Sequence, residues 1–170
     1  MGQLVPAFPL VGDPGDWPVL TLLAACALLE AEGEPFEGIL GVCWGVRRRA
    51  IDWQLGWHRA VLGPEGRAYD DGRLVEPISA FNDDYRARAM ARLSAATPAA
   101  TESSWKAAAA ALWNLLPDPV QGASFYLNPA VTLKIRGGTF PVWAADPQDA
   151  TKLNQQKLCA TVGRHVFLKA

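Results

Sequence analysis

A continuous apolar segment, residues 19–29, is the feature that most constrains the fold of this chain. Asp16 is a suitable N-cap and Pro18 suits a first helical turn, so the sequence predicts a helix over Trp17–Ala31. Because this helix would be apolar on nearly every side, we expect it at the centre of the hydrophobic core. The segment is too short to span a bilayer, and no positive charge precedes it, so we expect neither stable membrane insertion nor a signal peptide.

The chain of 170 residues fits one domain, residues 1–170, of the α+β class: mainly helical, with a small β element near the C-terminus. Three further helices are predicted from start and stop residues: from Glu34-Pro35 to Arg49, from Asp83 or Asp84 to Leu93, and from Thr101 or Ser103 to just before Pro117. Short strands are predicted within 122–127 and 164–168, and loops at 128–129 and 137–138. Residues 1–15 are expected to form an extended strap.

Three glycines, Gly38, Gly41 and Gly45, share one face of the second predicted helix, because they are spaced by three and four residues. Each glycine destabilises a helix by roughly 1 kcal/mol relative to alanine. We therefore expect this face to pack very closely against a neighbour, and the first helix is the predicted neighbour.

Charge is unevenly distributed, although the formal net charge is only −1. No Lys or Arg precedes Arg47, and arginines then fill positions 47–49. This basic block fits the solvated end of a helix, where cations complement the helix dipole, with contact to an anionic polymer as the alternative. The nearly neutral balance gives no basic field of the kind that nucleic-acid binding needs, so no nucleic-acid partner is expected.

The three cysteines, Cys26, Cys43 and Cys159, lie in apolar or helical contexts, and their odd number leaves at least one unpaired. Their spacing matches no zinc-binding pattern, and only His58 and His165 could supply imidazole ligands. We therefore expect reduced thiols, which suit synthesis in the cytoplasm, and neither a metal nor another cofactor.

Glu30 lies where the first predicted helix ends, shortly before a turn at Gly33. Three features would raise the pKa of its carboxyl: desolvation by the apolar helix, the negative end of the helix dipole, and repulsion from the glutamates at 32, 34 and 37. A carboxylic acid that stays protonated near neutral pH can protonate the leaving oxygen of a glycosidic bond. The alternative is that these four glutamates form only an exposed acidic turn.

Four sequence blocks, in the same order, resemble those of the spore cortex-lytic enzyme family of cell wall hydrolases. Leu29–Gly38, with its Glu-Ala-Glu-Gly-Glu-Pro-Phe core, is similar to the family signature, in which Glu-Ala/Ser-Arg-Gly-Glu-Pro precedes an aromatic residue. Ile78–Asn82 is similar to the family's Phe-Ser/Thr segment. Gly122–Pro129 resembles Gly-Ala-x-aromatic-Tyr-x-Asn-Pro, and Val162–Phe167 resembles Ile-Gly-x-His-x-Phe, so the likeness spans about residues 20–169.

The resemblance implies a lysozyme-like catalytic domain that cuts bacterial peptidoglycan between N-acetylmuramic acid and N-acetylglucosamine. Members are regarded as lytic transglycosylases, in which the first glutamate of the signature, here Glu30, acts as acid and then as base. Residues expected to bind substrate or to support Glu30 lie in the matched blocks or where members often carry tryptophan: Glu34, Ser79, Phe81, Asn82, Tyr126, Asn128, Trp143 and His165. The compact format is similar to a monomeric phage-type endolysin, made in the cytoplasm and freed by a holin or lysis, or carried in a virion.

The chain departs from the family pattern in two respects. Glu32 replaces the family's arginine, and the segments 63–75 and 132–158 are longer than in typical members, so the resemblance does not fix the shape of the substrate groove. Two other functions are open. The first is hydrolysis by Glu30 with a second carboxylate that activates water: Glu34, Asp83 or Asp84. The second, of a different class, is a non-catalytic glycan-binding or virion structural module.

Several of the supporting residues also have a purely structural interpretation. Asn128 could shape a turn, Glu34 could cap the second helix, and Ser79 and His165 could be structural. The tryptophans could stack on sugar rings, and we expect one or two to do so while the others belong to the core: Trp44, Trp53, Trp57 and Trp143.

Overall fold

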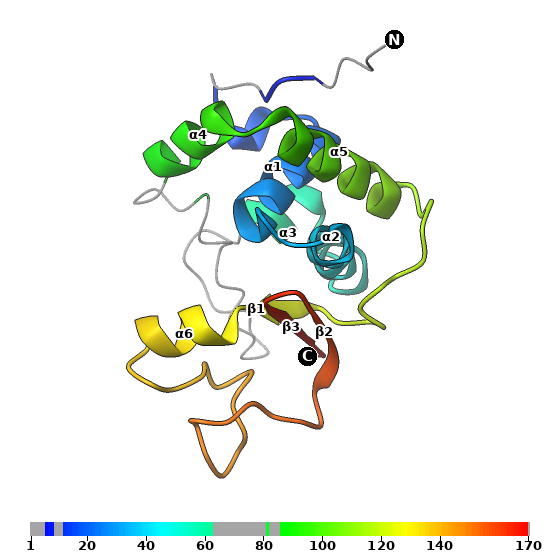
Figure 1. The fold of residues 1–170 in the computed structure, drawn as a ribbon. Helices are drawn as coiled ribbons and strands as arrows, with labels where there is room; N and C mark the ends of the chain where they lie inside the picture. Colours follow the sequence, from blue (N-terminus) through cyan, green and yellow to red (C-terminus); the bar gives the residue numbers. More distant parts are fainter. Residues whose placement is uncertain (1–5, 9–11, 63–80, 82–85, 170) are drawn as a thin grey trace.

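The computed structural model describes residues 6–8, 12–62, 81 and 86–169, and the predicted α+β class is confirmed over them (Figure 1). A three-stranded antiparallel sheet lies near the C-terminus, and the rest is mainly helical. The helices are η1 (Pro14–Asp16, a 3-10 helix), α1 (Val19–Ala31), α2 (Phe36–Asp52), α3 (Trp57–Leu62), α4 (Arg86–Ala95), α5 (Pro98–Leu112) and α6 (Pro129–Ile135). The strands are β1 (Phe125–Leu127), β2 (Leu158–Val162) and β3 (His165–Leu168).

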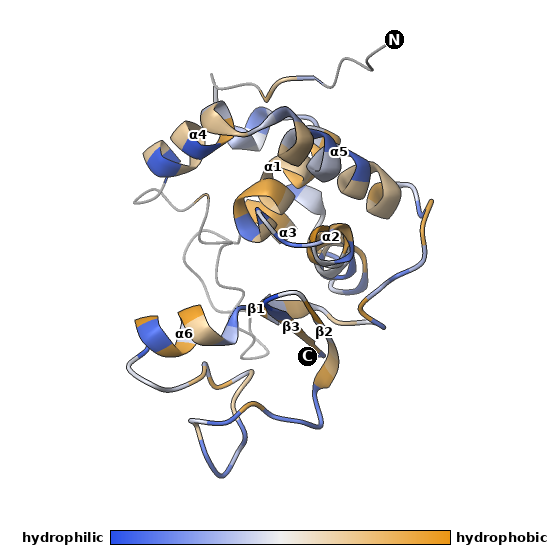
Figure 2. Ribbon diagram, in the orientation of Figure 1, coloured by the Kyte–Doolittle hydropathy of each residue, from blue (hydrophilic) through white to orange (hydrophobic). Residues whose placement is uncertain are grey.

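Helix α1 forms the centre of the core, as its apolar composition predicts. Residues 22–27 have no exposed surface, and α2, α3, α4 and α5 pack around the helix. Figure 1 shows α1 enclosed by these helices, and Figure 2 shows its apolar colouring. Full burial of one leucine side chain stabilises a fold by roughly 2 kcal/mol, so α1 is held firmly in place.

The N-terminal end of α1 differs from the prediction. The helix begins at Val19 with Pro18 at its N-cap, and Asp16 lies instead in the short helix η1, so Asp16 is not the cap. The predicted strap is not extended throughout, because η1 interrupts it and Phe8 is buried, with its ring stacked on that of Trp105 at 5.6 Å.

Other elements depart from the prediction for local reasons. Helix α5 begins at Pro98, before the predicted start, because Thr97 caps it: its hydroxyl accepts from the Ala100 backbone N–H (3.2 Å). The loop predicted at 128–129 is instead the start of α6, with Asn128 as N-cap. The sequence did not predict α3 or β2, which are short and weakly patterned.

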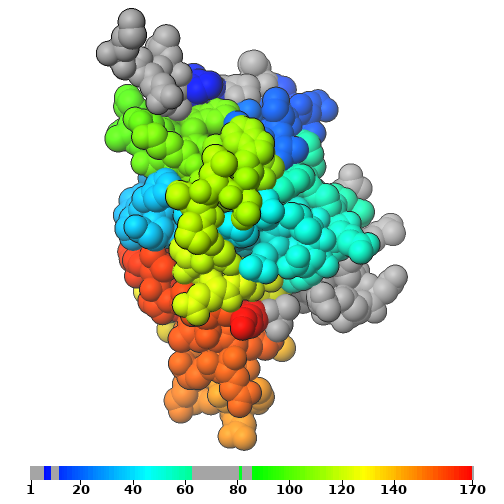
Figure 3. All heavy atoms as spheres, turned by 90° about the vertical axis from the view of Figure 1, so that its right-hand side faces the viewer, coloured from blue at the N-terminus to red at the C-terminus, as the bar shows by residue number. Residues whose placement is uncertain are grey.

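The sheet has the strand order β1-β3-β2, and its two faces meet different parts of the molecule. Tyr126 pairs with Phe167 and therefore shares a face with it, while alternate residues point to the opposite face. The first face lies against α2, and the second covers a small separate core that includes Phe140. Figure 3 shows the orange part of the C-terminal segment projecting from the helical part of the molecule.

The glycine face of α2 packs against the sheet, so the prediction that it meets the first helix is wrong. A Cβ at Gly41 would lie 2.7 Å from Val120 and 2.8 Å from Phe167, and a Cβ at Gly45 would lie 3.5 Å from Tyr126. α2 does contact α1, but through its other residues. The cost of the glycines is therefore offset by close approach between α2 and β-sheet side chains.

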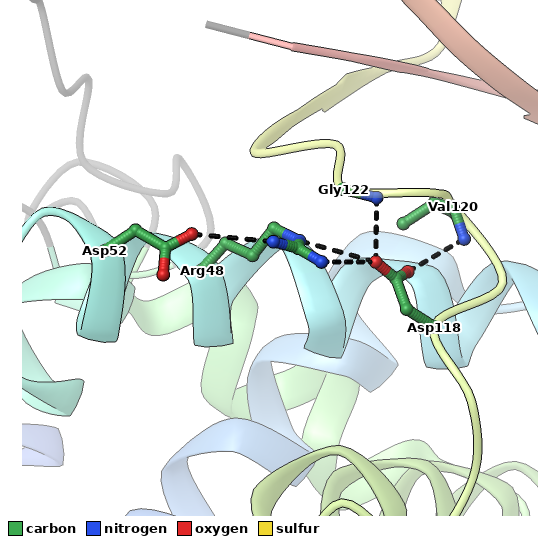
Figure 4. Close-up of polar contacts among 5 residues, drawn as sticks. All are labelled: Arg48, Asp52, Asp118, Val120 and Gly122. Atoms are coloured by element: carbon green, nitrogen blue, oxygen red, sulfur yellow. Dashed lines mark hydrogen bonds and ion pairs between the residues drawn. The ribbon is translucent and has the colours of Figure 1, made fainter.

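The arginine block is not the solvated helix end that was predicted, because each side chain reaches a different segment. Arg47 donates to the carbonyls of Ala111 and Leu112 at the end of α5, both at 2.9 Å. Arg48 pairs with Asp118 at 2.9 Å (Figure 4). The same figure shows Asp52 beside Arg48, at 3.5 Å, and Asp118 accepting hydrogen bonds from two backbone N–H groups of its own loop, those of Val120 and Gly122.

The three cysteines are free thiols, as predicted; Cys26 and Cys43 are buried, and Cys159 is half-buried. Burial raises the pKa of Cys26 well above its ordinary value, and it likewise raises the pKa of Cys43. None of the helices in the described part of the chain has both the length and the apolar character needed to cross a membrane.

Candidate functional site

Glu30 is in the last turn of α1, at the boundary between the buried core and the surface. Glu30 is half-buried, whereas residues 21–29 of α1 are buried. The chain then turns sharply at Gly33, whose φ of +81° is a conformation that glycine adopts without strain. The apolar helix therefore places this carboxyl in a partly desolvated position, as the sequence predicts.

The carboxylate of Glu30 acts on two buried groups, the Tyr126 hydroxyl and the Cys26 thiol. Burial, and then the negative charge of Glu30, raise the pKa of Tyr126 well above its ordinary value. The same two causes, in the same order, raise the pKa of Cys26, which lies one turn before Glu30 on α1. In both cases the positive charge of Arg49 has the opposite effect. Glu30, Cys26, Tyr126 and Arg49 thus form one electrostatic cluster, which we call the Glu30 cluster.

Arg49 is the member of this cluster that was predicted to lie at a solvent-exposed helix end. Arg49 is only 6% exposed, and its guanidinium lies over the Tyr126 ring, 5.8 Å from the ring centroid. Among the described residues, neither its Nε nor its Nη2 has a hydrogen-bond partner. One sequence feature could have indicated that Arg49 lies near β1. The glycines of α2 allow this helix to approach the sheet closely, and Arg49 is on the same helix.

Glu34 lies in the turn between α1 and α2 and ties this turn to the β2–β3 hairpin. Its buried carboxylate accepts from the Arg164 backbone N–H (2.8 Å) and from the Arg164 Nε (2.6 Å), and Nδ1 of His165 lies 3.6 Å away. Burial by itself would raise the pKa of Glu34, but the two hydrogen bonds and the charges of His165 and Arg164 lower it overall. The N-cap of α2 is Pro35, with no side-chain cap, so Glu34 does not cap that helix.

His165 contacts both Glu34 and the Glu30 cluster. Its ring meets that of Tyr126 edge-on, with centroids 6.1 Å apart. Burial lowers the pKa of His165, the charge of Glu34 raises it, and that of Arg164 lowers it, with a net decrease. His165 therefore connects the turn after Glu30 to the strand that carries Tyr126.

We expect the Glu34–Arg164 contact to make the free energy of unfolding depend on pH in the acidic range. Because the pKa of Glu34 is below its ordinary value of 4.5, its contribution is present above pH 4.5 and is lost as the pH falls through the pKa of the folded protein. Glu34→Gln should lower the free energy of unfolding at pH 7 by about 1.5 kcal/mol and should weaken its pH dependence below 4.5.

Urea denaturation at several pH values measures both effects. Glu37→Gln is the matched control, because Glu37 is exposed, and it should leave the curve unchanged. A Glu34→Gln variant that keeps the wild-type acid dependence would contradict the assignment.

The remaining predicted site residues are not all brought together. Asn128 caps α6 by accepting from the Val131 backbone N–H (3.2 Å), so it has a structural role, but as a helix cap rather than in the turn that was considered. Phe81 is buried in the core and meets the Trp17 ring edge-on at 6.3 Å. Ser79 and Asn82 lie outside the described residues, as do the two candidate second carboxylates at 83 and 84.

Three aromatic rings from the end of α2, from β1 and from the segment after α6 form a row. Phe125 lies between Trp143, stacked at 4.8 Å, and Trp53, tilted at 5.2 Å, and all three residues are half-buried. Trp53 follows Arg49 by one helical turn, and Phe125 precedes Tyr126 on β1, so its side chain lies on the opposite face of the sheet from Tyr126. Trp44 is instead buried, and Trp57 is half-buried, in contact with the main core.

The acidic turn around Glu30 is more nearly neutral than the sequence indicates. Glu32 pairs with Arg92 at 3.1 Å, and Glu34 pairs with Arg164. Two of the three glutamates that were expected to repel Glu30 therefore have a cation beside them. Partial burial, rather than an uncompensated group of carboxylates, is the feature of the prediction that the structure retains.

Comparison with models of known protein families gives no match, and searches of curated proteins and of solved structures likewise return no significant similarity.

Proposed function

We propose that the chain is a lysozyme-like lytic transglycosylase, which cleaves peptidoglycan between N-acetylmuramic acid and N-acetylglucosamine. The observation that carries the proposal is the position of Glu30: a half-buried carboxyl at the end of a buried apolar helix, where its charge acts on the Tyr126 hydroxyl. A general acid needs partial desolvation together with access to substrate, and this position provides both. The resemblance of the four sequence blocks supports the same substrate and the same residue.

In the proposed reaction, the Glu30 carboxyl donates its proton to the glycosidic oxygen as the bond from the muramic acid C1 breaks. The glucosamine unit leaves as an alcohol, and an oxocarbenium-like muramoyl species remains. The Glu30 carboxylate then removes the proton from the C6 hydroxyl of the same sugar, whose oxygen bonds to C1 and closes an anhydro ring. Glu30 is protonated again at the end, so the cycle balances without a second carboxylate or a cofactor.

The environment of Glu34 favours this route over hydrolysis. Hydrolysis with inversion or retention needs a second carboxylate that faces the sugar. Both oxygens of Glu34 already accept hydrogen bonds from Arg164, one each, and its side chain is 1% exposed. Glu34 is therefore better suited to holding the turn after Glu30 than to activating water.

The aromatic row offers a surface for the glycan strand. Sugar rings bind to the faces of aromatic side chains, because these faces offer a large, rigid apolar surface. Trp53 and Trp143 are the two outer members of the row, and both are partly accessible. They are our candidates for the one or two sugar-binding tryptophans that we expect from the sequence.

The products of digestion test the reaction. When purified peptidoglycan is digested and the soluble fragments are analysed by mass spectrometry, each new muramic end should be one water lighter than a reducing end. New muramic ends that are all reducing would instead establish hydrolysis. Binding to the wall without soluble fragments would favour a non-catalytic module. We also propose that the chain is a monomeric endolysin-type enzyme, which meets the wall after release or within a virion.

A further inference from the structure

Arg49 has an environment that is unusual for a charged side chain. The residue is more than nine-tenths buried, and two of its guanidinium nitrogens, Nε and Nη2, have no hydrogen-bond partner in the part of the chain that the structure describes. Burial of a charge is unfavourable unless another charge or a set of hydrogen bonds compensates it. Packing alone therefore does not account for a cation at this position.

The neighbouring arginines do not share this environment. Arg47 is bonded to the α5 carbonyls, and Arg48 is paired with Asp118. Arg92 and Arg164 are likewise paired, with Glu32 and Glu34. Arg49 differs from these four arginines, because its charge acts on Tyr126 and Cys26 in the Glu30 cluster.

Arg49 and Glu30 act with opposite sign on the same two groups. The guanidinium lies over the ring of Tyr126, and its charge favours the ionised forms of Tyr126 and Cys26, which the charge of Glu30 disfavours. Two opposite charges that act on the same hydroxyl and the same thiol, in a poorly solvated place, also stabilise each other.

We propose that Arg49 is a positioning residue of this site: its guanidinium holds the Tyr126 ring and stabilises Glu30 as a carboxylate once the proton has been given to the leaving group. This inference rests on the proposed function, because it assigns Arg49 to the interval between the two proton transfers. At that point the half-buried Glu30 carries a negative charge, and the Arg49 guanidinium on α2 is already positioned to compensate it.

The described groups around this pair come from several elements. Cys26 is on α1, and Cys43, which acts on Cys26, is on α2. Tyr126 is on β1, and the His165 ring on β3 meets the Tyr126 ring edge-on. In the turn that follows Glu30, the two nearest acids are each paired with an arginine. Changing Arg49 therefore alters a cation that acts on Tyr126 and Cys26 without removing either of these ion pairs.

The test compares Arg49→Gln and Arg49→Met, which remove the charge, with Arg49→Lys, which keeps it. A general acid must be protonated to act, so activity falls as the pH rises through its pKa. Loss of the cation disfavours the carboxylate, so the alkaline limb of the pH–activity profile should move to higher pH by about one unit in the two neutral variants. Arg49→Lys should keep the wild-type limb. A limb that stays in place in folded Gln and Met variants, or that moves equally in the Lys variant, would overturn the inference.

A second readout does not depend on activity. The side-chain carboxyl signals of glutamate, labelled with carbon-13, can be followed by NMR during a pH titration, with Glu30→Gln used to assign Glu30. The Glu30 signal should titrate at higher pH in Arg49→Gln than in the wild type, while the Glu34 signal, whose partner is Arg164, should not move. An unchanged Glu30 titration overturns the role of Arg49. Absence of cleavage by the wild-type protein would instead overturn the proposed function, so the two failures are distinguishable.

Discussion

Glu30→Gln should reduce the rate at which the protein clears a peptidoglycan suspension by at least about 100-fold, because a positioned general acid contributes roughly that factor or more. Glutamine has nearly the same shape as glutamate but cannot give up a proton to the glycosidic oxygen. Since Glu30 lies at the edge of the core rather than inside it, the fold should be retained. The measurement is the initial rate of turbidity loss, with circular dichroism to compare the folds.

Glu37→Gln provides the matched control for this loss. Glu37 belongs to the same acidic sequence but is exposed in the first turn of α2, so its substitution should leave clearing within a factor of about two of the wild type, as a solvated surface change usually does. Full activity of Glu30→Gln would remove the basis of the proposed function. Equal losses in the two variants would mean that the acidic turn as a whole, rather than one carboxyl, is needed.

Gly41→Ala should lower the free energy of unfolding by about 2 kcal/mol, although alanine is the better helix former. The new Cβ would lie between 2.7 and 2.9 Å from side-chain atoms of Val120 and Phe167. Phe167 is fully buried, so it has little room to move, and overpacking of this kind costs about 1 to 3 kcal/mol, occasionally more. Urea or thermal denaturation measures the change.

Gly45→Ala separates close packing from helix propensity. A Cβ there meets Tyr126 at 3.5 Å, which is an ordinary van der Waals contact. This variant should therefore be neutral or should gain up to about 1 kcal/mol from the higher helix propensity of alanine. If Gly41→Ala were as stable as Gly45→Ala, the close approach of α2 to the sheet would not be a determinant of stability.

The parts of the fold that the sequence predicts correctly are those with strong local patterns. The apolar run of α1 and its end near Glu30 follow from composition and from Gly33. Helices α2, α4 and α5 and strands β1 and β3 were expected at nearly their observed positions. Two short elements were missed for different reasons. Strand β2 depends on its pairing with β3, which no local pattern shows, whereas the start signals of α6, Asn128 as N-cap and Pro129 after it, were interpreted as a loop.

The candidate site is only partly readable from the sequence, because its contacts join distant segments. Glu30 and Tyr126 were both named, but the interactions between Glu34 and Arg164 cross 130 residues of chain and no local pattern shows them. Arg49 was misassigned for the same reason. In a run of three arginines the sequence gives no indication of which one faces the interior, and only the register of α2 against the sheet decides it.

The consecutive positions of Arg47, Arg48 and Arg49 have a mechanical consequence. Successive residues on an α-helix project about 100° apart. Within one turn of α2, these side chains therefore contact three different segments: the end of α5, the loop around Asp118 and the ring of Tyr126. These segments cannot shift independently of that turn. A force applied to α2, by a bound polymer or by a crosslink, would therefore be transmitted to α5 and to strand β1 together.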